Sequence, residues 1–140
     1  MISDLMSPAN CACFNLRRAA RQATQAFDRA LRPAGIQATQ FTLLALLAQS
    51  GEADMPVTEL AGRLGLDRTT LTRNLAVAER SGWLESRPGE DRRERRVALT
   101  DAGRAKLAAA LPLWKSAQTR VVVEMGEDRM ADLLTTLRQM

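Results

Sequence analysis

The sequence contains no histidine and no tyrosine among its 140 residues, and its only cysteines are Cys11 and Cys13. Histidine is the commonest general base and a frequent zinc ligand, so its absence removes the residue on which much enzyme chemistry depends. None of the eight glycines falls into a phosphate-binding loop pattern. We therefore expect a protein that is not an enzyme and that uses no cofactor and no metal.

Long apolar runs are absent as well. The longest, residues 41–48, is interrupted by Thr42 and is far shorter than the roughly 20 residues that span a bilayer. The chain starts Met-Ile-Ser-Asp-Leu, without the basic region and apolar core of a signal peptide. The two cysteines lie too close together in sequence to staple a domain, which fits a reducing compartment. These absences predict a cytoplasmic protein with no membrane contact.

The charged residues are mostly basic, and the basic residues are mostly arginine. Lys and Arg number 20 against 16 Asp and Glu, which leaves a net charge of +4. A planar guanidinium binds phosphate or guanine through two parallel hydrogen bonds, so the excess favours a nucleic-acid partner. Arginine-rich codon usage in a GC-rich genome explains the same excess equally well. With 46% hydrophobic and 26% charged residues, the chain is typical of one globular domain.

Hydrophobic spacing predicts a mainly α-helical fold with a small β-hairpin. Alternating character predicts strands over 83–87 and 95–99, on either side of turn residues 88–91. Residues 52–56 are predicted to form a polar turn, and Pro112 should kink the long helix that contains it. Apolar residues recur at helical intervals, between turn or capping residues, over 8–32, 39–50, 58–64, 67–78, 101–125 and after Gly126.

The predicted helix 67–78 has two different faces. Leu71, Leu75 and Ala78 form an apolar stripe, and the opposite face is polar and carries arginine. A helix that reads the DNA major groove needs such hydroxyl, amide and guanidinium groups for phosphates and base edges. A plain solvated helix face would have the same composition, so this segment alone leaves both interpretations open. The candidate DNA-binding residues are Arg68, Thr69, Thr70, Thr72, Arg73 and Asn74.

The predicted hairpin provides a second, independent indication of DNA binding. Five arginines crowd around its turn, where Glu90, Asp91 and Glu94 would orient the guanidinium groups. Such a tip fits the minor groove of narrow A-T tracts, whose negative potential attracts arginine. The alternative is ion pairing within the chain, which contributes little on a surface. The candidate DNA-binding residues here are Asp91, Arg92, Arg93 and Arg95, with Arg87 and Arg96 beside them.

Four motifs follow one another in the order Val57–Ala61, Leu64–Arg73, Asp91–Arg93 and Val97–Gly103. Together they resemble the MarR family of winged helix-turn-helix transcription regulators, and the resemblance covers most of the chain. It implies a dimer with interlocked N- and C-terminal helices, and repression by occupying an operator. It also implies that helix 67–78 enters the major groove and that the hairpin, or wing, enters the minor groove.

Carried over residue by residue, the resemblance makes Asp91 and Arg93 the acid and the arginine of the wing tip. Trp83 and Pro112 depart from the family pattern and affect local geometry only, because neither is a DNA-reading residue. The residues that match the recognition face are Arg68, Thr69, Thr70, Thr72 and Arg73.

The chain is predicted to be one domain, with a winged helix-turn-helix module at 36–100 and dimerisation helices at 1–35 and 101–140. The outer helices have apolar stripes too extensive for the small central module to cover, so a homodimer is expected on composition as well. Two-fold symmetry then predicts a pseudo-palindromic operator in double-stranded DNA, with half-sites about one helical turn apart. A non-specific architectural DNA binder is an alternative, but it would need no polar recognition helix.

Cys11 and Cys13 lie just before or within the first turn of the first predicted helix, where the helix dipole favours the thiolate. They are either a sensor of oxidants, electrophiles or a soft metal ion, or small residues packed at the dimer interface. On a regular helix their side chains point about 200° apart, so a cross-chain disulfide is easier than a direct bridge. A thiol-based metal or redox protein is the alternative function, but it leaves the order of helices and hairpin unexplained.

The other candidate switch is a small-molecule effector, an apolar or aromatic anion bound between the outer helices and the winged module. Aromatic residues make up only 4% of the chain, so each of them is either a pocket residue or part of the core. The candidates for the pocket, besides methionines, are Trp83, Trp114, Phe14, Phe27 and Phe41.

Overall fold

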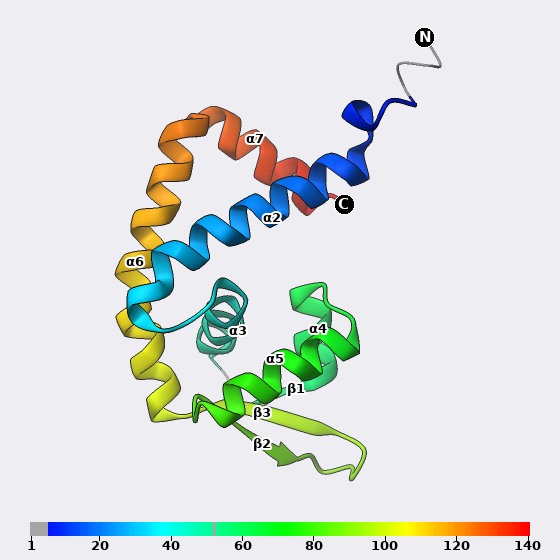
Figure 1. Cartoon of the computed structure of the whole chain (residues 1–140). Coiled ribbons are helices and arrows are strands. Elements are labelled where there is room, and N and C mark those ends of the chain that lie inside the picture. The colour runs from blue at the N-terminus through cyan, green and yellow to red at the C-terminus, as the bar shows by residue number, and fades with distance from the viewer. Residues whose placement is uncertain (1–5, 52) are drawn as a thin grey trace.

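The computed structural model describes residues 6–51 and 53–140 and is mainly helical with one small sheet, as predicted (Figure 1). Met1–Leu5, which the signal-peptide argument used, and Glu52 of the expected turn lie outside the described residues. Among the described helices, none is long and apolar enough to cross a membrane. The elements are η1 (Pro8–Asn10), α2 (Ala12–Leu31), η2 (Arg32–Ala34), α3 (Ala38–Gln49), β1 (Met55–Pro56), α4 (Val57–Leu64), α5 (Arg68–Arg80), β2 (Leu84–Pro88), β3 (Arg95–Leu99), α6 (Asp101–Met125) and α7 (Glu127–Arg138).

The elements form two groups that the long helix α6 connects (Figure 1). At one end lie α2 and α7, and at the other lie α4, α5 and the β2–β3 hairpin, with α3 between them. Helix α6 runs along the side of the molecule and contacts α2, α3 and α7. It continues without a break through Pro112, where a kink is expected, and it bows along its length.

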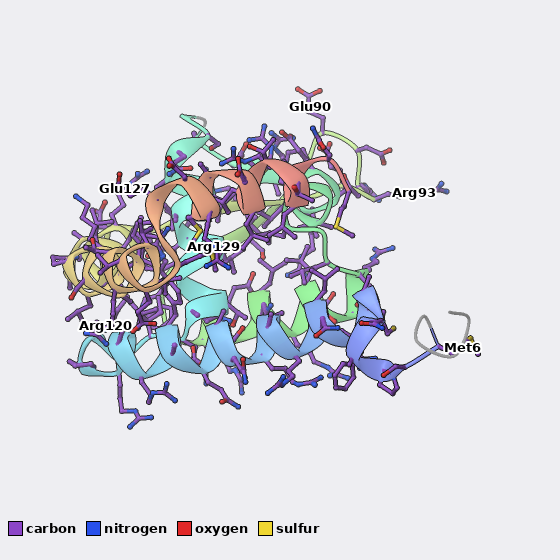
Figure 2. All side chains as sticks on the ribbon, turned by 90° about the horizontal axis from the view of Figure 1, so that it is seen from above. Met6, Glu90, Arg93, Arg120, Glu127 and Arg129 are labelled. Atoms are coloured by element: carbon purple, nitrogen blue, oxygen red, sulfur yellow. The ribbon has the colours of Figure 1, made fainter. Side chains whose placement is uncertain are left out.

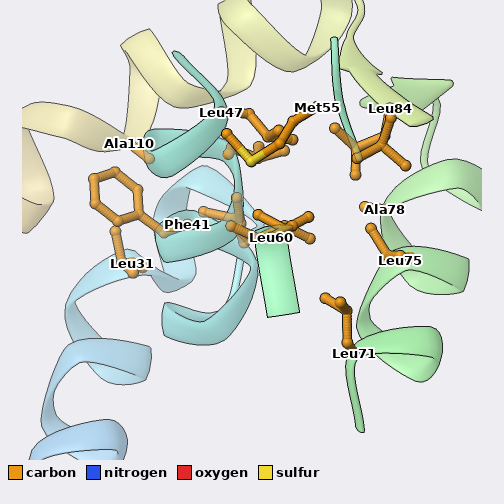
Figure 3. Close-up of a cluster of buried hydrophobic side chains, with 14 residues drawn as sticks. Leu31, Phe41, Leu47, Met55, Leu60, Leu71, Leu75, Ala78, Leu84 and Ala110 are labelled. Carbon is orange, nitrogen blue, oxygen red and sulfur yellow. The ribbon is translucent and has the colours of Figure 1, made fainter. Parts of the chain in front are cut away.

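The hydrophobic core is centred on α3, which is apolar on most of its circumference and contributes Phe41 and Leu44 (Figure 3). Leu71, Leu75 and Ala78 of α5 pack into this core, so the apolar stripe predicted for this helix is confirmed. Burial contributes about 25 cal/mol per Å² of apolar surface. One continuous core therefore holds α5 and the hairpin against α3 and α6. It also contains Leu31, Leu43, Leu47, Met55, Leu60, Leu84, Val97 and Ala110.

The sheet has three antiparallel strands in the order β1-β3-β2, one more than the predicted hairpin. Strands β2 and β3 pair from Leu84 opposite Leu99 to Pro88 opposite Arg95. The additional strand is β1, in which Met55 pairs with Val97, so the expectation of a simple polar turn at 52–56 is wrong for this part. Met55 is fully buried, and burying it brings the backbone of β1 alongside the free edge of β3.

The N-terminal helix starts later than the predicted residue 8. Residues Pro8–Asn10 form a 3-10 turn, Cys11 is extended, and α2 begins at Ala12. The Cys11 Sγ accepts a hydrogen bond from the Phe14 N–H at 3.5 Å, which caps the helix. The two cysteines therefore stand at the N-cap and in the first turn of α2, within the region predicted for them.

Candidate nucleic-acid interface

Helix α5 turns one side to the core and the opposite side to solvent. Asp67 caps its N-terminus, because the Asp67 Oδ1 accepts a hydrogen bond of 2.7 Å from the Thr70 N–H. At 100° per residue, the exposed positions of α5 extend over about 200° of the helix circumference, and the part from Arg68 to Arg73 covers about 140° of it. Because the core contacts fix the helix on its other side, the side from Arg68 to Arg73 faces solvent. Its exposed residues are Arg68, Thr69, Thr72, Arg73 and Ala76.

Electrostatics and hydrogen bonding further define this surface. The Thr70 backbone N–H, and then its hydroxyl, donate hydrogen bonds that lower the pKa of Asp67, with a smaller contribution from the charge of Arg73. Thr72 is exposed, and its hydroxyl donates a hydrogen bond of 2.7 Å to the Arg68 carbonyl one turn earlier. Thr70 is exposed on the flank of the helix, and Asn74 is half-buried at the edge of the face. The face thus combines guanidinium groups with threonine side chains.

The wing tip is closed by backbone hydrogen bonds and by Asp91. The Gly89 N–H donates to the Glu94 carbonyl at 2.8 Å, and the Arg93 N–H donates to the Asp91 carboxylate at 3.1 Å. Arg92 and Arg93 are exposed, and Figure 2 shows Arg93 pointing away from the body of the molecule. Within the described part of the chain, neither guanidinium has a carboxylate within 4 Å. The tip therefore carries two cations that are available to an anionic partner.

The other three arginines of the wing contact carboxylates of the chain. Arg96 bridges Asp54 and Glu94, each at 2.8 Å, and the hydrogen bond that its guanidinium donates to the Asp54 carboxylate raises the pKa of Arg96. Arg95 lies 3.8 Å from Glu79 of α5, and Arg87 pairs with Glu85. These contacts are the ion pairs within the chain that were considered as the alternative for the hairpin arginines. Among the described residues, three of the five wing arginines are therefore paired, whereas Arg92 and Arg93 at the tip are not.

Glu79 also connects the wing to α5, because its carboxylate accepts a hydrogen bond from the Ser86 hydroxyl of β2 in addition to the contact with Arg95. Between the two elements lies a cavity of about 360 Å³. Arg68, Thr72 and Ala76 line it from α5, and Arg93 and Arg95 line it from the wing. One edge of the exposed face of α5 and Arg93 of the wing tip thus border the same cavity.

The cysteines lie far from this surface, at the free end of α2 (Figure 1). Both thiols are unpaired and exposed. Among the described residues, no group of three or more His, Cys, Asp or Glu side chains could hold a metal ion together.

Three of the five aromatic candidates for an effector pocket come together. Phe41 stacks on Trp114 with ring centroids 5.8 Å apart, and Phe27 lies 6.4 Å from the same ring. They line a cavity of about 220 Å³ between α2, α3 and α6, together with Ala23, Thr24, Ala38 and Thr42. Trp83 instead packs under the Lys106 ammonium, 5.6 Å from it, and Phe14 is exposed on α2.

The sequence patterns did not point to Asp54, Glu79 or Gln40 as contributors to this site. Asp54 lies 42 residues before its partner Arg96, and Gln40 lies 34 residues before the residue of α5 that it contacts. Such pairs arise only when the fold brings distant segments together. The one available indication was the polar residue Gln40 directly before the apolar run that starts at Phe41 in α3.

Comparison with known proteins agrees with this geometry. The family model of the MarR family matches residues 34–94. The crystal structure of the M. tuberculosis transcriptional regulator MosR in complex with DNA has a TM-score of 0.82 and 45% sequence identity, covering 92% of this chain and 94% of that one.

Two curated bacterial relatives give the same result. The transcriptional repressor MprA of Escherichia coli is 31% identical over 122 residues, which is 81% of this chain and 69% of MprA. The uncharacterised HTH-type transcriptional regulator YwoH of Bacillus subtilis is 31% identical over 91 residues, and this match spans 65% of each protein. The chain belongs to the MarR family, and the relatives that it matches are transcriptional regulators rather than enzymes.

Proposed function

We propose that this protein is a sequence-specific repressor that binds a pseudo-palindromic operator in double-stranded DNA as a homodimer. The observation that carries the proposal is the cavity that the exposed face of α5 and Arg93 of the wing tip border together. The solved complex of the related MosR with DNA supports it. In this arrangement α5 enters the major groove, and the wing follows the adjacent minor groove.

The two parts of the surface have different roles in this proposal. Arg68 and Arg73 supply guanidinium groups for guanine edges or phosphates, and Thr72 is an exposed threonine, a residue type that contacts base edges through its hydroxyl or methyl group. Arg92 and Arg93 bind the negative potential of the minor groove. Base contacts discriminate between sequences, whereas phosphate contacts add affinity for all DNA. Arg73 therefore governs the choice of operator, and the wing provides much of the affinity.

The test is a mobility-shift titration of a duplex that the wild-type protein selects from a random library. Arg93→Ala should weaken binding by about 1–3 kcal/mol with the fold intact. Arg73→Ala should change the relative affinities for operator variants, and Arg21→Ala, an exposed control on α2, should change neither. Unchanged affinity in Arg93→Ala would contradict the wing assignment. If Arg73→Ala weakens all sequences equally, Arg73 is a phosphate anchor, and the case for a non-specific architectural DNA binder gains weight.

The homodimer is proposed from apolar side chains that this chain leaves uncovered. They lie on α2, α6 and α7, at the end of the molecule opposite the DNA-binding surface (Figure 1). Each such side chain favours burial by about 25 cal/mol per Å², and a second copy with the same stripes covers them symmetrically. Sedimentation analysis should give twice the mass of the chain. The uncovered side chains include Phe14, Leu16, Val123, Leu133 and Leu137.

Release of the operator by a small aromatic molecule is proposed from the cavity around Trp114. Its lining is aromatic and aliphatic with two threonine hydroxyls and carries no charged residue, so an aromatic ring fits it better than the charged end of an anion. The cavity lies between α2, α3 and α6, where occupancy changes how the outer helices sit on the module. In a Trp83→Phe background, quenching of Trp114 fluorescence by aromatic compounds should parallel loss of operator binding. Quenching without any change in operator affinity would contradict this role.

Thiol modification is a second proposed route of release, favoured by two exposed thiols at the start of α2. Both thiols are accessible from solvent, and the thiolate form of an accessible cysteine is the one that peroxides and soft metals attack. Operator titrations should compare reduced, peroxide-treated and metal-loaded protein, together with Cys11→Ser and Cys13→Ser. Equal affinities in all of these states would reduce the cysteines to packing residues.

A further inference from the structure

Gln40 is the one polar residue among the buried residues of the described chain, with 3% of its surface exposed. Its Nε2 donates a hydrogen bond of 3.1 Å to the backbone carbonyl of Asn74 in α5. Its Oε1 is buried and has no hydrogen-bond partner among the described residues. An amide placed in an apolar core with an unsatisfied oxygen costs stability. The presence of Gln40 in this core is therefore not explained by a contribution to stability.

The hydrogen bond joins two parts of the molecule that otherwise meet through apolar contacts. Gln40 belongs to α3, which packs against α2 and α6, whereas Asn74 lies between the core residues Leu71 and Leu75 of α5. Apolar contacts are not directional, so they permit small rotations and translations of a helix. A hydrogen bond depends on distance and angle. It therefore fixes α5 at one rotation and one axial position relative to α3.

We propose that Gln40 is a positioning residue for operator recognition, which sets the orientation of α5 so that its exposed face meets the base edges in register. This inference rests on the proposed function. The anchored carbonyl belongs to Asn74, in the middle of the segment that carries Thr72 and Arg73, so a small rotation there displaces both side chains. Phe41, next to Gln40 on α3, stacks on Trp114 in the aromatic cavity. A displacement of α3 at this cavity therefore reaches α5 through the hydrogen bond between Gln40 and Asn74.

A structural role and a positioning role for Gln40 predict opposite effects of Gln40→Met on the melting temperature. Methionine has a similar length, removes the unsatisfied Oε1, and leaves the Asn74 carbonyl to the helical hydrogen bond it accepts from four residues later. Replacing a poorly satisfied buried polar group by an apolar one of similar shape is neutral or stabilising. The melting temperature should therefore stay the same or rise, while recognition of the operator becomes worse.

The matched control is Gln49→Met, the same substitution at an exposed position of the same helix. Hydrogen–deuterium exchange without DNA should become faster in residues 68–80 of Gln40→Met and should not change in the control. The ratio of affinities for the selected duplex and for its scrambled version should fall about tenfold, the equivalent of about 1.4 kcal/mol. The affinity for the scrambled duplex should stay constant in both variants.

Unchanged exchange in residues 68–80, or an unchanged affinity ratio, would overturn the proposal. A fall in melting temperature that accompanies a general loss of DNA binding would also overturn it, because the role of Gln40 would then be structural. If the wild-type protein enriches no sequence from the library, the proposed function itself fails and this inference falls with it. That outcome is recognised before any variant is compared.

Discussion

Gly103, in the first turn of α6, is a position where one methyl group should decide stability. It is buried, and a Cβ added there would lie 2.1 Å from the Trp83 carbonyl oxygen and 3.2 Å from the Leu99 Cδ2. That oxygen is held in place, because it accepts a hydrogen bond of 3.1 Å from the Thr100 N–H. Gly103→Ala therefore drives the start of α6 against backbone at the base of the wing, where no side chain can rotate away.

Two opposing contributions decide whether Gly103→Ala stabilises or destabilises the protein. Alanine is favoured over glycine inside a helix by about 1 kcal/mol. Against this, a carbon–oxygen contact needs roughly 3.3 Å, so the two segments must separate by about 1 Å. Overpacking of this kind costs about 1–3 kcal/mol, and weakening the Thr100 hydrogen bond costs about 1 kcal/mol more. We expect a net destabilisation of about 2 kcal/mol, which lowers the melting temperature by roughly 6 °C.

The matched control is Gly62→Ala in α4, where an added Cβ meets no atom within 4 Å beyond its chain neighbours and the backbone of its own helix. The same substitution there should stabilise the protein by about 0.5–1 kcal/mol, through helix propensity alone. Thermal denaturation followed by circular dichroism checks both, at equal protein concentrations because association shifts the melting temperature. A Gly103→Ala variant as stable as wild type would refute the steric argument.

Three further outcomes follow from the structure. Because the pKa of Asp67 is lowered, its stabilising effect is complete above a pH of about 4 and is lost as the pH falls through the folded value. The melting temperature of Asp67→Ala should therefore lie below wild type at pH 7, and the gap should narrow at pH 3; a constant gap would exclude the charged cap. Arg96→Met should lower the melting temperature because Arg96 bridges two carboxylates, whereas Arg92→Met should leave it unchanged and weaken DNA binding. Deleting residues 127–140 should reduce solubility and operator affinity together, and a soluble truncation with full affinity would contradict the proposed dimer.

Local features of this fold were predictable because they depend on residues close together in sequence. The helical period of Leu71 and Leu75, with Asp67 ahead of them, determined both the start and the buried side of α5. Alternating residues on either side of a turn determined the hairpin, and Thr100 marked the start of α6. The polar face of α5 followed without further information, because in a helix the position of one side determines the other.

Only the tertiary structure decided which of these groups are free and which are engaged. The sequence places five arginines near the wing tip, but the positions of Asp54, Glu79 and Glu94 leave Arg92 and Arg93 available. Strand β1 and the bond from Gln40 to α5 likewise join segments tens of residues apart. Hydrophobic periodicity shows which side of an element is buried. It does not show which element covers that side, because this depends on how the whole chain packs into one core.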